Sequence, residues 1–75
     1  MLNLQVPYLY RFEDQEIGPV HINTMDIIEI KNYENNSNWS TVILQNGNSY
    51  TSFMSPEEFV ADILNSYNRT MKAYT

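Results

Sequence analysis

The dipeptide Asn46-Gly47 lies between two short segments that are rich in β-branched and aromatic residues. Asn-Gly in this setting is the strongest local signal for a tight β-hairpin, because a type I′ turn requires positive φ at both central residues. We therefore predict strands at residues 39–45 and 49–54, joined by a two-residue turn. The first cross-strand pair outside that turn is expected to be Gln45 with Asn48.

This register decides which side chains share a face of the hairpin, because successive residues of a strand point to opposite sides. It pairs Leu44 with Ser49 and Ile43 with Tyr50. The residues predicted on one face are Trp39, Thr41, Ile43, Tyr50, Ser52 and Met54. Those predicted on the other face are Val42, Leu44, Thr51 and Phe53. Both faces are substantially apolar, so both require a cover.

The sequence Ser55-Pro56-Glu57-Glu58 carries several agreeing signals for the start of a helix. Ser55 is a good N-cap, proline suits the first helical position, and Glu58 completes a capping box. Apolar residues then recur at helical spacing as far as Met71. We predict one helix over residues 56–72.

The first half of the chain contains three further segments with strand character, at residues 4–12, 17–22 and 27–33. Gly18-Pro19 interrupts the second of them, where a bend or bulge is expected. The sequence therefore predicts one α+β domain over residues 1–75. It is a small antiparallel sheet or partly closed barrel of about five strands, at residues 4–54, followed by the C-terminal helix.

Composition excludes several kinds of site. The chain has no cysteine and one histidine, His21, which removes disulfides, thiolate metal sites and any site with two imidazoles. A net charge of −5 disfavours direct binding to nucleic acid. Neither a signal peptide nor a membrane span is evident, so a cytoplasmic protein that does not bind membranes is expected. No cofactor or metal motif and no catalytic constellation is found, and we predict that the protein is not an enzyme.

A single helix of this length covers only one face of a five-stranded sheet. The second face is buried either by closure of the sheet into a barrel or by another copy of the chain. Oligomerisation is a common way for so short a chain to gain stability, and exposed apolar faces favour association. We therefore expect a homo-oligomer.

Five residues form the candidate binding set. The aromatic residues Trp39, Tyr33 and Tyr50 are predicted close to the hairpin, and Lys31 and Arg11 on neighbouring strands. Aromatic rings beside one or two cations are suited to stacking a base and holding a phosphate. The same rings are also suited to a core or a subunit interface, which is the more common role for them.

The region from Val20 to Leu64 contains a recognisable order of motifs. These are Val20-His21-Ile22-Asn23, Ile27-Ile28-Glu29-Ile30, Thr41-Val42-Ile43-Leu44-Gln45-Asn46-Gly47 and Ser55-Pro56-Glu57-Glu58-Phe59, with Ile63-Leu64 in the helix. In this order the chain resembles the small FlbD-like flagellar and swarming motility family and similar short phage-encoded proteins. The resemblance implies the same succession of strands, hairpin and helix, and a role through protein–protein contacts.

Two functions follow from these observations. The first is a non-catalytic binding or inhibitory protein, a phage or mobile-element accessory factor that blocks a host protein or sequesters a small nucleotide signal. The second, implied by the resemblance, is a bacterial motility accessory protein. An acidic mimic of nucleic acid is a weaker third hypothesis, because the carboxylates are distributed along the whole sequence.

Overall fold

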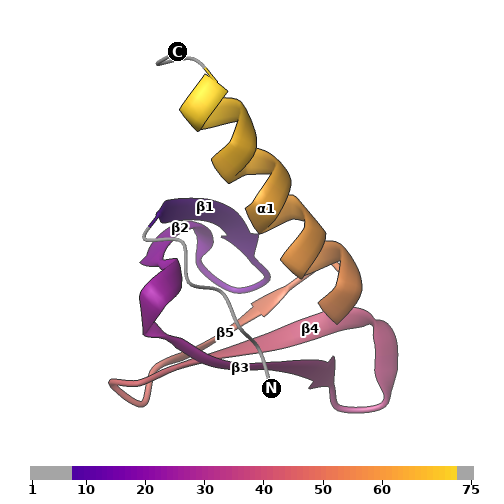
Figure 1. Cartoon of the computed structure of the whole chain (residues 1–75). Helices are drawn as coiled ribbons and strands as arrows, with labels where there is room; N and C mark the ends of the chain where they lie inside the picture. The colour runs from indigo at the N-terminus through magenta and orange to yellow at the C-terminus, as the bar shows by residue number, and fades with distance from the viewer. Residues whose placement is uncertain (1–7, 73–75) are drawn as a thin grey trace.

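The computed structural model describes residues 8–72 and contains five strands, a short 3-10 turn and one helix (Figure 1). In chain order the elements are β1 (Leu9–Asp14), β2 (Gly18–Asn23), η1 (Thr24–Asp26), β3 (Ile27–Tyr33), β4 (Asn36–Leu44), β5 (Ser49–Ser52) and α1 (Pro56–Lys72). The strands form one antiparallel sheet in the order β2-β1-β5-β4-β3. Its edge strands β2 and β3 do not pair, so the sheet is not closed. The predicted α+β class is confirmed.

Helix α1 begins where the sequence predicts. Ser55 Oγ accepts a hydrogen bond from the Glu58 N–H at 3.2 Å, and Glu58 Oε1 accepts one from the Ser55 N–H at 3.1 Å. This reciprocal pair is the capping box. It satisfies backbone donors that the first turn of a helix otherwise leaves without partners.

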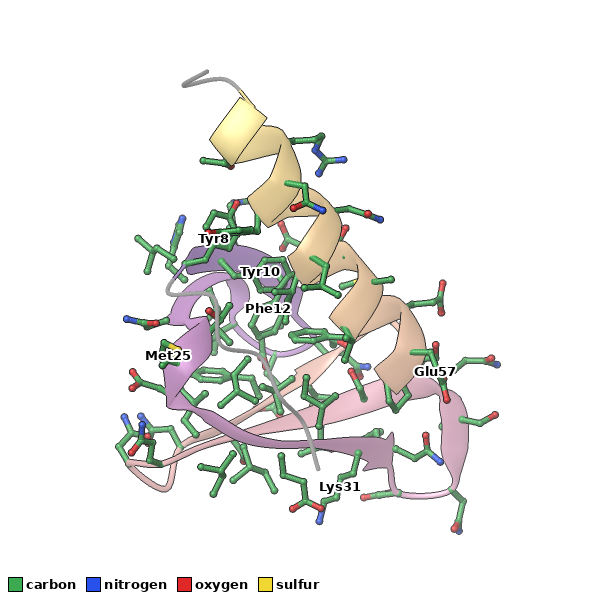
Figure 2. All side chains as sticks on the ribbon, in the orientation of Figure 1. Tyr8, Tyr10, Phe12, Met25, Lys31 and Glu57 are labelled. Atoms are coloured by element: carbon green, nitrogen blue, oxygen red, sulfur yellow. The ribbon has the colours of Figure 1, made fainter. Side chains whose placement is uncertain are left out.

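Helix α1 lies across one face of the sheet, which we call the inner face; the opposite side is the outer face (Figure 1). Figure 2 shows Tyr10 and Phe12 pointing from β1 toward α1. Their rings meet Phe59 at centroid distances of 5.4 and 5.0 Å. The buried apolar core consists of Tyr10, Phe12, Val20, Ile22, Val42, Leu44, Phe59 and Ile63.

The hairpin of β1 and β2 is regular. Its register runs without interruption from Leu9–Asn23 to Asp14–Gly18, so of the bend or bulge predicted at Gly18-Pro19 the bulge is wrong. Gly18 instead ends the turn with a φ of 80°, which glycine adopts without steric cost. Pro19 follows on an edge strand, where a missing N–H donor is tolerated. The part of the predicted first strand before Tyr8 lies outside the described residues.

The predicted register of the hairpin formed by β4 and β5 is wrong by one residue. Ile43 pairs with Ser49 and Val42 with Tyr50, so the connection has three residues. The Leu44 N–H donates to the Asn48 carbonyl, the Gly47 N–H donates to the Leu44 carbonyl, and Gly47 has a φ of 91°. This is the geometry of a three-residue hairpin with a glycine bulge rather than that of a two-residue turn.

The shift moves every β5 side chain to the other face relative to β4. Tyr50 and Ser52 lie with Val42 on the inner face, whereas Thr51 lies with Thr41 on the outer face. The predicted grouping of Tyr50 with Trp39 is therefore wrong. The connection between the strands predicted at residues 27–33 and 39–45 is also shorter than expected, because β4 begins at Asn36 and pairs there with Tyr33.

Only one residue pair, Asp14 with Ser52, joins β1 to β5. The Asp14 carboxylate strengthens this junction, since it accepts hydrogen bonds from the backbone N–H groups of Thr51 at 2.8 Å, Glu16 at 2.9 Å and Ile17 at 3.1 Å. The Gln15 side chain adds a bond to the Ser52 carbonyl at 2.8 Å. The hydrogen bonds that join the β1–β2 hairpin to β5 thus come largely from Asp14, which is buried, and from Gln15.

No helix in the described part of the chain is long and apolar enough to cross a membrane.

Candidate binding surface

Three aromatic residues form a continuous patch on the outer face, which we call the outer aromatic patch: Tyr33, Trp39 and Phe53. The Tyr33 and Trp39 rings are 6.0 Å apart between centroids, and those of Trp39 and Phe53 are 6.1 Å apart at 90°. The pair of Trp39 and Phe53 is edge-to-face, an arrangement that aromatic rings prefer, and the pair of Tyr33 and Trp39 is tilted at 39°. Phe53 is 57% exposed, and the other two are half-buried. The patch therefore presents a preformed apolar surface.

The alternation of β4 places Trp39 on this face. Ser40, Val42 and Leu44 are buried on the inner face, so Thr41 and Ile43 point outward between them, and Trp39, directly before Ser40, points outward to the ring of Phe53. Because α1 covers only the inner face, none of its residues is among the aromatic contacts of the patch.

A buried hydrogen bond lies directly beneath the patch. The Ser40 and Ser52 hydroxyls are 2.5 Å apart, and both residues are at most 1% exposed. The Ser52 hydroxyl also contacts the backbone N–H and carbonyl of Met54 at 3.2 Å. Since Ser40 follows Trp39 and Ser52 precedes Phe53, this network fixes the backbone that carries two of the three rings.

The five candidate residues predicted from sequence do not form one site. Tyr33 and Trp39 are in contact, but Tyr50 lies on the inner face with its ring 6.1 Å from that of Phe12. Arg11 lies on β1 and pairs with Glu13 at 3.1 Å. Lys31 lies on β3, opposite Thr41.

The two cations do not converge. Strands β5 and β4 separate β1 from β3, so three strand spacings of roughly 4.8 Å, about 14 Å across the sheet, lie between the strands of Arg11 and Lys31. A phosphate group bound beside the aromatic rings would contact at most one of them. The predicted combination of a stacking platform with paired cations is not assembled by this fold.

Phe53 is the residue that sequence reasoning missed. The two-residue turn assigned it to the face of Val42, whereas the three-residue connection places it against Trp39. The sequence contained one relevant signal. A glycine in the third position of Gln45-Asn46-Gly47 is also typical of a three-residue hairpin with a bulge.

A pocket of about 260 Å³ adjoins the patch where β1, the end of β5 and α1 meet. Its lining residues are Tyr10, Arg11, Phe12, Glu13, Phe53, Met54 and Asp62.

The Tyr10 hydroxyl donates to Asp62 Oδ2 at 2.5 Å. Burial, then the hydrogen bond to Asp62 and its negative charge, raise the pKa of Tyr10 well above its usual value. Tyr10 is therefore a permanent donor that ties α1 to β1, and it is unsuited to acid–base work near neutral pH.

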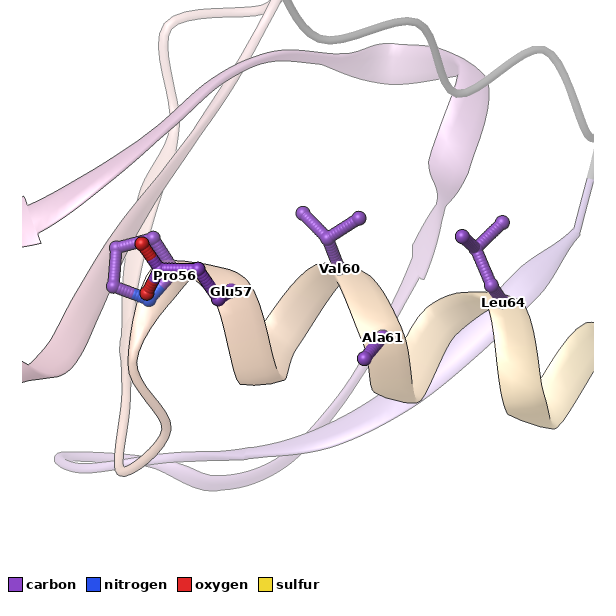
Figure 3. Close-up of a pocket in the computed structure, with 5 residues that line it drawn as sticks. All are labelled: Pro56, Glu57, Val60, Ala61 and Leu64. Carbon is purple, nitrogen blue, oxygen red and sulfur yellow. The ribbon is translucent and has the colours of Figure 1, made fainter.

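A second hollow, of about 460 Å³, lies along one side of α1 (Figure 3). It is lined by Pro56, Glu57, Val60, Ala61 and Leu64. Figure 3 shows Val60 and Leu64 projecting from the same side of the helix. Apart from the Glu57 carboxylate these side chains are apolar, so they offer a ligand little directional recognition.

Among residues 8–72, no three His, Cys, Asp or Glu side chains are grouped so that they would hold a metal ion. His21 lies on β2 opposite Arg11, exposed on the outer face.

No family model, curated protein or solved structure matches this chain. The resemblance to the FlbD-like family therefore stays a prediction.

Proposed function

We propose that the chain is a non-catalytic binding protein that self-associates and blocks a target protein, as small phage and mobile-element accessory factors do. The observation that carries this proposal is the outer aromatic patch. Tyr33, Trp39 and Phe53 form a contiguous apolar surface on the sheet face that α1 leaves uncovered. Aromatic residues are enriched at the centres of protein interfaces, where their large rigid surfaces contribute most of the binding energy.

A protein target is better supported than a small nucleotide. A nucleotide needs cations near the stacked base, but Arg11 is paired with Glu13 and lies on β1, so Lys31 on β3 is the only one of the two candidate cations near the patch. The net charge of −5 adds long-range repulsion of phosphate. The same charge favours encounter with a basic protein surface.

A non-catalytic role is supported by the chemistry of the described side chains. The most perturbed titratable group, Tyr10, is held as a hydrogen-bond donor within the core. The second perturbed group is Asp14, whose carboxylate oxygens accept hydrogen bonds from three backbone N–H groups. Both groups stabilise the fold, and neither is free to transfer a proton to a substrate.

Native mass spectrometry of the protein, purified gently from the cells that produce it, tests the proposal. Wild-type protein is expected to retain a second kind of polypeptide, and Trp39→Ala is expected to lose it while keeping the wild-type circular dichroism spectrum. Leu9→Ala is the matched control, because Leu9 is 65% exposed on the same face but lies on β1, away from the patch. Retention of the same polypeptide by Trp39→Ala, or wild-type protein without any retained polypeptide, contradicts the proposal.

A further inference from the structure

Strand β3 is an edge strand with one side open in the described structure. It pairs with β4 on one side only. Within residues 8–72, no strand pairs with its other side and no backbone hydrogen bond outside the ladder involves residues 28–33. An open edge of this kind carries unpaired N–H and C=O groups and is a template for another strand.

The side chains of β3 restrict which strand fits. Glu29 and Lys31 lie opposite Ile43 and Thr41 on the outer face, two positions apart. Both are exposed, and neither belongs to an ion pair within the described residues. Figure 2 shows Lys31 pointing away from α1. The edge thus presents a negative charge before Ile30, at Glu29, and a positive charge after it, at Lys31.

We propose that β3 pairs antiparallel with β3 of a second copy about a two-fold axis at Ile30. In this arrangement Glu29 lies opposite Lys31 of the second copy, and Lys31 lies opposite Glu29 of the second copy. The two sheets continue into one sheet of ten strands, with both α1 helices on the same side. This inference rests on the self-association in the proposed function and specifies the surface responsible for it.

Charge selects this register over its neighbours. If the two-fold axis moves from Ile30 to Glu29, Glu29 lies opposite Glu29 of the second copy. If it moves to Lys31, Lys31 lies opposite Lys31 of the second copy. Cross-strand pairs of opposite charge stabilise a sheet, and like charges directly opposite destabilise it. Only the register centred on Ile30 gives two favourable pairs.

The irregularities of β3 confine the contact. The pairing of β3 with β4 is regular from Glu29 to Asn32 and is interrupted between Ile27 and Glu29 and between Asn32 and Tyr33. Bulges twist a strand and end its pairing, so the seam is short. Ile28, which is 61% exposed, lies at the start of the seam and adds apolar surface to it. The dimer is therefore expected to be reversible and salt-sensitive.

Sedimentation of the purified protein, with no other component and across a wide range of concentration, tests the pairing. Wild-type protein is expected to be a reversible dimer. Glu29→Lys places two pairs of like positive charge across the seam, and Lys31→Glu places two pairs of like negative charge there. Each is expected to weaken dimerisation by about tenfold or more. The double swap, which exchanges the two charges, restores it.

The decisive sample is an equimolar mixture of Glu29→Lys with Lys31→Glu. The first variant presents two positive charges and the second two negative charges, so the mixture is expected to form a heterodimer that neither variant forms alone. Glu16→Lys and Arg69→Glu are matched controls on exposed positions outside β3 and should dimerise like the wild type. If net charge alone weakened dimerisation, the two control variants would also dimerise less than the wild type.

A monomeric wild type, wild-type dimerisation by both single swaps, or failure of the mixture to associate overturns the pairing. The target-binding part of the proposed function fails separately, if Trp39→Ala retains the target or the wild type retains none. If the charge swaps leave the dimer intact while Trp39→Ala still loses its target, only the β3 pairing is wrong.

Discussion

The inner and outer faces of this sheet come from the same strands but are built differently. On the inner face, Val42 is fully buried together with Phe59 and Ile63 of α1, and the buried hydroxyls of Ser40 and Ser52 bond to each other. No buried side-chain polar atom among the described residues lacks a partner. On the outer face, Phe53 and Leu9 are more than half exposed although both are large and apolar.

This difference assigns separate tasks to the two faces. The inner face has the density and hydrogen-bond satisfaction that stability requires. The outer face has rings held in place by one another, with no described element above them, and this is a composition suited to binding. Stability and binding should therefore respond to different substitutions.

The largest effect is expected at the centre of the inner face. Phe59 is fully buried against Tyr10 and Phe12, so Phe59→Ala removes the ring that joins α1 to β1. Truncation of a buried phenylalanine costs about 3–5 kcal/mol of unfolding free energy, which is a large share of the stability of so small a domain. Urea unfolding followed by far-UV circular dichroism measures it. A loss below about 1 kcal/mol would show that α1 is not essential to the core.

The junction between β1 and β5 gives the next effect. Asp14→Ala is expected to cost about 2 kcal/mol, since it leaves three backbone N–H groups without their charged acceptor. Urea unfolding at neutral pH measures this loss. Gln15→Ala is the control from the same junction and should cost less, because its side chain makes a single neutral hydrogen bond.

Asp14 also makes stability depend on pH. Burial works to raise the pKa of this carboxyl, but the N–H groups of Thr51, Glu16 and Ile17 outweigh it and lower the pKa below the ordinary value of 3.8. Its contribution is therefore complete above the unfolded-state pKa and is lost as the pH falls through the lower folded-state pKa. The difference between wild type and Asp14→Ala should shrink as acid is added below about pH 4. A difference that stays constant down to pH 2 would contradict this role.

The outer face is expected to tolerate truncation. Trp39 is half-buried and contacts only Tyr33 and Phe53 among the aromatic residues. Trp39→Ala should therefore cost about 1 kcal/mol, far less than Phe59→Ala. The two variants are compared by urea unfolding in the same buffer. Equal losses would mean that both faces are structural, and the contrast between them would fail.

The smallest expected effect is a gain of stability. Glu34 adopts a φ of 51° in the tight turn between β3 and β4, which is a left-handed conformation that costs a residue with a Cβ about 1 kcal/mol. Glu34→Gly should raise the unfolding free energy by up to about 1 kcal/mol, and the thermal midpoint measures it. Glu16→Gly, in a turn outside this strain, should not stabilise. A loss of stability in Glu34→Gly would show that its side chain has a role.

Much of the fold could be predicted because its signals are local. The capping box of Ser55 and Glu58 specifies the start of α1, and alternation specifies the two faces of β1. The hairpin register was less accessible, because Asn46-Gly47 fits connections of both two and three residues. Long-range contacts decide between them: only the observed register places Tyr50 against Phe12 and Ser52 against Ser40.

The same single-residue shift explains the partial success with the site. The contact between the rings of Tyr33 and Trp39 follows from the short connection between β3 and β4. The exclusion of Tyr50 and the inclusion of Phe53 both depend on the register of β5. The separation of Arg11 from Lys31 depends on strand order, which nothing in the local sequence specifies.

Trp39 is the only tryptophan of the chain, so its fluorescence reports on the outer aromatic patch alone. Acrylamide quenching of this fluorescence, before and after the retained target polypeptide is separated from the native protein at high salt, tests the central claim most directly. We predict that Trp39 is shielded in the complex and becomes several-fold more accessible to quencher once the target is removed. Equal quenching in the two samples would contradict the claim that the outer aromatic patch is the binding surface.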